Sequence, residues 1–144
     1  MDRQVVDQKL ESLRSCLKRI EAKCPEHAEA LLTDLDLQDI LALNLSRAVQ
    51  LAVDMGAHII AQLEVPAPGT MGQTFGLLAD EGVLSQDLAQ QLKKAVGFRN
   101  IAVHSYDAIN WHIVHSIARN HLRDFSYFAV AVVTWMDEHQ RENP

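Results

Sequence analysis

Apolar residues recur at steps of three and four along most of the chain, and each such run predicts an amphipathic helix. The first run covers residues 2 to 24 and stops at Pro25, which cannot continue a helix. Its stripe is formed by Val6, Leu10, Leu13, Leu17, Ile20 and Cys24. Residues 25–34 predict a connection with room for one helical turn. A long helix is then expected over 37–64, capped by Asp34 or Asp36. Because apolar residues also lie off its main stripe, we expect this helix to be the central one, touched on several sides.

The second half of the chain begins at the segment VPAPGTMG (65–72), whose prolines and glycines predict a break. A short helix is expected over 73–83, closed by Gly82, and a third long helix after the cap residue Ser85. The buried edge of that third helix is predicted to be Leu88, Leu92, Ala95, Val96 and Ala102. Asp107 is expected to cap a further helix over 109–122, and the apolar segment 123–140 predicts the last one.

The chain therefore predicts an all-α fold. No segment shows convincing strand alternation, and glycine (6) and proline (4) are scarce, which disfavours a turn-rich β fold. We expect one helical domain over residues 1–144, an antiparallel bundle of four or five main helices. Its aromatic residues are predicted to lie in the core or at an interface: Trp111, Phe125, Tyr127, Phe128 and Trp135. The most apolar stretch, 125–136, is too short to cross a bilayer, so no membrane partner is expected.

Composition narrows the class of partner. The formal net charge is −6, so a general electrostatic grip on nucleic acid is disfavoured, and an RNA contact must come from a local basic patch. If Cys16 and Cys24 share one helix, they stand about 12 Å apart along its axis, too far for a mutual disulfide. We therefore expect a reduced, cytoplasmic protein. The start MDRQVVDQKL has no apolar stretch of the kind that a signal peptide requires.

Candidate chemistry is concentrated in GFRNIAVHSYD (97–107). On a regular helix Arg99 falls within the apolar stripe of the third long helix, and burying its charge alone would cost several kcal/mol, so it needs a partner or a wet cleft. His104 lies about 140° away around the helix, so the two side chains do not converge within one regular helix. Either the helix ends or bends before His104, helped by Gly97, or the two groups meet across a subunit boundary.

Two interpretations of this cluster remain open from the residues alone. In the structural one, Arg99 pairs with Asp107 or Asp124, while His104 and Tyr106 only cap or pack. In the chemical one, the cluster cleaves RNA, whose own 2′-hydroxyl is the nucleophile. Histidine can then move the proton and arginine can hold the phosphate, with no metal and no cofactor. Asn100 could add a hydrogen bond to sugar or phosphate.

The run RNIAVHSY resembles the Arg-x4-His-x-Tyr motif of the HEPN superfamily, in particular the HepT-like toxins, and Asn100 fits the polar residue after the arginine. The resemblance implies an all-helical, metal-independent ribonuclease toxin, a homodimer with both motifs in one cleft, and an MntA-type nucleotidyltransferase antitoxin as partner. It further implies that Arg99 holds the scissile phosphate, that His104 is the general acid or base, and that Tyr106 accepts AMP. A non-catalytic module that docks a nucleotidyltransferase is the alternative, because similar bundles serve that role.

Other polar residues have weaker interpretations. Lys93 and Lys94 could add positive field at the cleft, although isolated lysines commonly sit on solvated helix faces. Arg119 and Arg123 could form an RNA-binding rim together with nearby histidines. His112 and His115 can share a helix face, but no cysteine or well-spaced carboxylate accompanies them, so no metal site is predicted.

Overall fold

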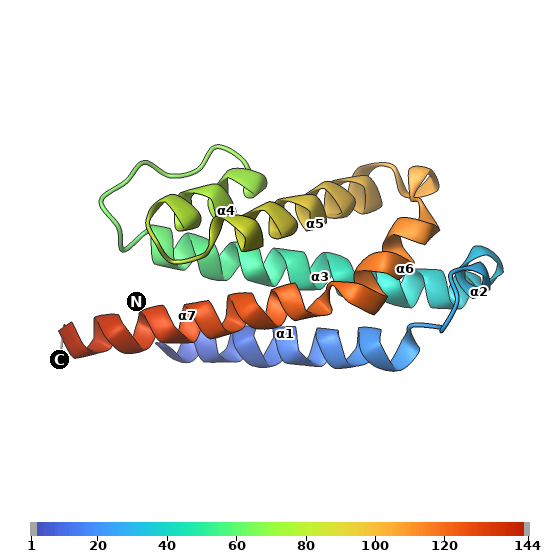
Figure 1. The fold of residues 1–144 in the computed structure, drawn as a ribbon, viewed down its shortest axis with the longest axis horizontal. Coiled ribbons are helices and arrows are strands. Elements are labelled where there is room, and N and C mark those ends of the chain that lie inside the picture. Colours follow the sequence, from blue (N-terminus) through green and yellow to red (C-terminus); the bar gives the residue numbers. More distant parts are fainter. Residues whose placement is uncertain (1–2, 143–144) are drawn as a thin grey trace.

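The computed structural model describes residues 3–142, and over this range every regular element is helical (Figure 1). This confirms the predicted all-α class. The elements in chain order are α1 (Arg3–Lys23), α2 (Glu29–Thr33), α3 (Leu35–Ile60), α4 (Met71–Asp80), α5 (Gln86–His104), the short 3-10 helix η1 (Tyr106–Ala108), α6 (Trp111–Asn120) and α7 (Leu122–Glu142). None of the described helices has both the length and the hydropathy that crossing a membrane would require.

The long helix α3 is the centre of the bundle, as its apolar residues on several sides predict. It contacts α1, α2, α4, α5, α6 and α7. Figure 1 shows α1 and α7 running along one side of α3, with α4 and α5 on the other and α2 at one end. Two polar side chains buried on α3 are satisfied locally, since Gln38 donates to the Leu31 carbonyl at 2.7 Å and Asn44 to the Ile40 carbonyl at 2.8 Å.

Short polar side chains start the helices where hydroxyl or carboxylate oxygens can accept from the exposed backbone N–H groups of the first turn. Asp34 caps α3, and Ser85 caps α5, as predicted. Thr70 caps α4, which therefore begins at Met71 rather than at 73. Gly82 has a φ of +79°, the left-handed conformation expected of the glycine that closes a helix.

Two further predicted boundaries are wrong for identifiable reasons. Helix α3 ends at Ile60, not 64, because the next backbone groups form tight three-residue turns ahead of Pro66 (Gln62 N to Ile59 O and Leu63 N to Ile60 O, each 2.9 Å). Asp107 caps no helix and lies within η1. Asn110 is the cap of α6 instead, accepting from the backbone of His112 at 3.0 Å.

The core has two parts. The larger surrounds most of α3 and includes the edge-to-face pair Phe75–Phe128, with ring centroids 5.7 Å apart. The smaller lies toward α2 and α6 and contains Phe98 of α5, which anchors the helix directly before Arg99. Of the aromatics predicted to lie in the core or at an interface, Phe125, Phe128 and Trp135 are buried. Trp111 is half-buried, and Tyr127, 57% exposed, is not a core residue. Cys16 and Cys24 are both free thiols, as predicted.

Candidate active site on helix α5

Arg99 lies half-buried on α5 and points toward α3 and α4, as its place on the apolar stripe predicts. Its Nη2 donates to Gln50 Oε1 at 3.2 Å, and its Nη1 contacts Met71 Sδ at 3.5 Å. Both partners are neutral, and no carboxylate in residues 3–142 forms an ion pair with Arg99. The structural interpretation, in which Arg99 pairs with Asp107 or Asp124, is therefore wrong. Asp124 lies 3.4 Å from His121 Nδ1, and Asp107 is exposed beyond the end of α5.

Gln50 is held in a fixed orientation by the central helix. Its Nε2 donates to Asp54 Oδ1 at 2.9 Å, one turn further along α3, and Asp54 Oδ2 lies 3.5 Å from Lys9 Nζ of α1. The amide carbonyl is therefore the end left to face Arg99. Sequence reasoning missed Gln50. The four-residue spacing to Asp54 was visible, but nothing in the sequence links position 50 to position 99.

His104 is the last residue of α5 and is exposed. The helix does not end or bend before it, because the α-helical bonding continues to Ser105, whose N donates to Ile101 O at 2.8 Å. The expectation that the helix ends or bends before His104 is wrong. A Cβ at Gly97 would meet nothing within 4 Å, so no other backbone approaches closely at this glycine. Arg99 and His104 therefore face different sides of one chain. Asn100 is exposed on the same helix.

Tyr106 begins η1, directly after the helix, and is held from two sides. Its hydroxyl donates to Asp39 Oδ1 of α3 at 2.5 Å, and its ring packs edge-to-face on Trp111 with centroids 5.9 Å apart. Burial, and then the hydrogen bond and negative charge of Asp39, raise the pKa of Tyr106 above its ordinary value, so the phenol stays neutral near neutral pH. The residue as a whole remains 40% exposed. Asp39, 67 positions away, was also missed by sequence reasoning.

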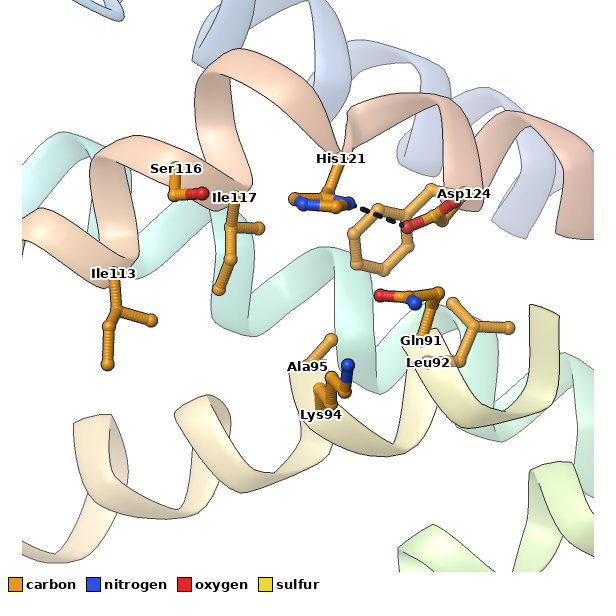
Figure 2. Close-up of a pocket in the computed structure, with 10 residues that line it drawn as sticks. Gln91, Leu92, Lys94, Ala95, Ile113, Ser116, Ile117, His121 and Asp124 are labelled. Carbon is orange, nitrogen blue, oxygen red and sulfur yellow. Dashed lines mark ion pairs between the residues drawn. The ribbon is translucent and has the colours of Figure 1, made fainter. Parts of the chain in front are cut away.

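The basic residues suggested for RNA binding do not form one patch. Lys94 lines a cavity of about 310 Å³ between α5, α6 and α7, where Figure 2 shows it across from the His121–Asp124 pair. Arg119 and Arg123 line a separate cavity of about 410 Å³. Lys93 leans over α4, where its Nζ lies 3.1 Å from the position of a Cβ at Gly76.

The histidines of α6 have separate environments. His115 Nε2–H donates to the Pro25 carbonyl at 2.8 Å, which ties α6 to the connection after α1, while His112 is exposed. Within residues 3–142, no three His, Cys, Asp or Glu side chains are placed to hold a metal ion together.

Comparison with known proteins shows the family of the chain over a range that includes residues 97–107. Residues 13–132 match the family model described as Ribonuclease HepT-like. The chain belongs to the ribonuclease HepT-like family. Among relatives of this family, the mRNA nuclease HepT of Shewanella oneidensis is 36% identical over 86% of this chain and 92% of its own length. The tRNA nuclease HepT of Aphanizomenon flos-aquae is 26% identical over 78% of this chain and 76% of its own.

Solved structures agree with the HepT-like assignment. A tri-AMPylated Shewanella oneidensis HEPN toxin, in complex with its MNT antitoxin, superposes with a TM-score of 0.85 at 34% identity and covers 93% of this chain and 99% of its own. A toxin–antitoxin complex with AMP-PNP gives 0.86 at 32% identity, covering 92% and 99%. The Bacillus subtilis protein YutE, at 16% identity, shares the fold with a TM-score of 0.83.

Proposed function

We propose that this chain is a metal-independent endoribonuclease toxin that cleaves RNA with Arg99 and His104 in a cleft shared by two copies. The observation that carries the proposal is the environment of the Arg99 side chain. It is a half-buried cation on the motif helix, held by an amide and a thioether, with no carboxylate pairing with it in the described chain. Relatives named as mRNA and tRNA nucleases support the same substrate class.

The chemistry needs only groups that the motif supplies. The 2′-hydroxyl of the RNA attacks the adjacent phosphorus, the bond to the 5′-oxygen breaks, and a 2′,3′-cyclic phosphate remains. His104 takes the 2′-hydroxyl proton or gives one to the departing 5′-oxygen. The guanidinium of Arg99 stabilises the charge that builds on the phosphate oxygens. In this proposal Asn100, which is exposed directly after Arg99, donates a hydrogen bond to sugar or phosphate.

In this proposal a second copy of the chain brings Arg99 and His104 to the same phosphate. Arg99 faces the bundle and His104 faces solvent at the helix end, so one chain does not bring both to one phosphate. A two-fold axis near the end of α5 brings the Arg99 of one copy toward the His104 of the other. The exposed aliphatic residues Ile101 and Val103, which flank His104, suit such an interface.

The toxin is inactivated, in this proposal, through modification of Tyr106. In this proposal a cognate MntA-type nucleotidyltransferase transfers AMP to the Tyr106 hydroxyl, two residues beyond His104. The phosphate adds negative charge and the nucleoside adds bulk, and both exclude RNA from the neighbouring cleft. The support is the partial exposure of Tyr106 and the similar HEPN toxin whose solved structure is tri-AMPylated and in complex with an MNT antitoxin.

The test is cleavage of total RNA by purified protein in EDTA. Wild type should remain active, whereas R99A and H104A should each lose at least about a hundredfold in rate, because each removes one part of the catalysis. Matched controls are R14A on α1 and H27A in the connection between α1 and α2, which change exposed residues of the same types outside the motif helix.

Loss of wild-type activity in EDTA would contradict the metal-independent mechanism. If R99A and H104A cleaved RNA as fast as wild type, the active-site assignment would be wrong, and the chain would be better described as a module that docks a nucleotidyltransferase.

A further inference from the structure

The Tyr106 hydroxyl has a carboxylate partner contributed by a distant part of the chain. Asp39 lies near the start of α3, and its Oδ1 accepts the hydrogen bond from Tyr106 at 2.5 Å. Such a short contact between a hydroxyl and a charged acceptor is a strong hydrogen bond. Asp39 is exposed, and it forms no ion pair within residues 3–142, so its negative charge is not shared with a cation.

The ring of Tyr106 is also fixed in direction. Trp111 packs against it edge-to-face, with 66° between the ring planes, from the first residue of α6. The carboxylate and the indole come from two different helices and hold the phenol between them. The hydroxyl hydrogen therefore points at Asp39, and Tyr106 as a whole residue is 40% exposed.

We propose that Asp39 is the proton acceptor for nucleotidylation of Tyr106, so that the toxin chain supplies the base for its own modification. This inference rests on the proposed function, in which Tyr106 receives AMP. The co-reactant is a nucleoside triphosphate bound by the partner nucleotidyltransferase.

The step balances with these groups alone. The Tyr106 oxygen forms a bond to the α-phosphorus of the triphosphate, and the bond from that phosphorus to the bridging oxygen breaks. Pyrophosphate leaves with the bonding electrons. The phenol proton passes to the Asp39 carboxylate along the existing hydrogen bond, and from there to water.

The need for such a base follows from the environment of Tyr106. A phenol held neutral by its surroundings is a poor nucleophile until its proton has somewhere to go. The same carboxylate that keeps the proton on the oxygen at rest becomes its acceptor when the bond to phosphorus forms, because the acidity of the phenol rises sharply at that moment.

The experiment measures transfer of labelled AMP from ATP to the full-length chain by its MntA-type nucleotidyltransferase. In wild type the label should reach Tyr106, and Y106F should take up none there. D39N keeps an oxygen that can accept the hydrogen bond but lacks the basicity of a carboxylate, so its initial rate should fall about a hundredfold. D39E restores a carboxylate and should recover most of that rate.

D36N is the matched control, since Asp36 is an exposed acid one turn earlier on α3, and its rate should equal that of wild type. Far-UV circular dichroism and the melting temperature of each variant check the fold. Labelling of D39N at the wild-type rate would overturn the role of Asp39 while leaving the proposed function intact. Absence of label at Tyr106 in wild type would overturn the proposed modification and this inference together.

Discussion

At the scale of single residues, Tyr106 shows how one neighbour sets the chemistry of a side chain. Its hydroxyl is partly buried and bonded to Asp39, and both effects disfavour the phenolate. The raised pKa stabilises the fold at every pH below the ordinary value of 10.0, and this contribution is lost as the pH rises above it. Physiological conditions lie well inside the stabilised range.

The ionisation of Tyr106 can be followed directly, because Tyr127 is the other tyrosine in the sequence. In a Y127F background the phenolate absorbance should appear with a midpoint above 10.0. Adding D39N should lower that midpoint, since the change removes the negative charge beside the phenol. Circular dichroism on the same samples checks that the helices persist. An unchanged midpoint would show that Asp39 does not hold the proton.

At the scale of helices, the contact between α3 and α4 depends on the absence of a side chain at Gly56. A Cβ built there would lie 2.8 Å from Thr74 Cγ2 and 3.0 Å from Leu78 Cδ1, and both neighbours are buried. By contrast, a Cβ at Gly97 of α5 would meet nothing within 4 Å. Both glycines lie within helices, but only Gly56 has close neighbours where a side chain would be.

Replacing each glycine by alanine should therefore change stability in opposite directions. G56A should lower the free energy of unfolding by about 1–3 kcal/mol, because the methyl group overpacks the α3–α4 contact. G97A should raise the free energy of unfolding by up to about 1 kcal/mol, because alanine favours the helix and its methyl group meets no neighbour there. Urea unfolding at one protein concentration measures both. Equal destabilisation by the two substitutions would contradict this account of the packing.

Most helices could be predicted from the sequence because their apolar periodicity is set by burial against α3. Boundaries were harder where capping decided them, as at Asn110, since Asp107 is an equally plausible cap in the sequence. The partners of the site could not be predicted. Gln50 and Asp39 reach Arg99 and Tyr106 through contacts between helices, which depend on how α3 and α5 pack rather than on any local pattern.

At the scale of the whole molecule, the proposed cleft exists only in a dimer, and subunit mixing tests this directly. R99A and H104A should each be inactive alone. After subunit exchange, half of the dimers contain one copy of each, and in their shared cleft one of the two Arg99–His104 pairs is intact. Activity should then return to about a quarter of the wild-type level.

The mixed sample also separates the two possible arrangements of the residues. If Arg99 and His104 of the same chain acted together, every site in the mixture would lack one of them. A mixture as inactive as its two components, although shown to contain mixed dimers, would therefore contradict a cleft built from both copies.

The neutral surroundings of Arg99 also bear on the order of events when RNA arrives. The chain carries 19 acidic residues, yet within the described part none of them pairs with this guanidinium. In the proposed mechanism, an entering phosphate has no internal anion to displace and meets a guanidinium whose inner side already contacts Gln50 and Met71. The guanidinium gives up part of its hydration when the chain folds. Less free energy is therefore spent on removing water from it when the phosphate binds.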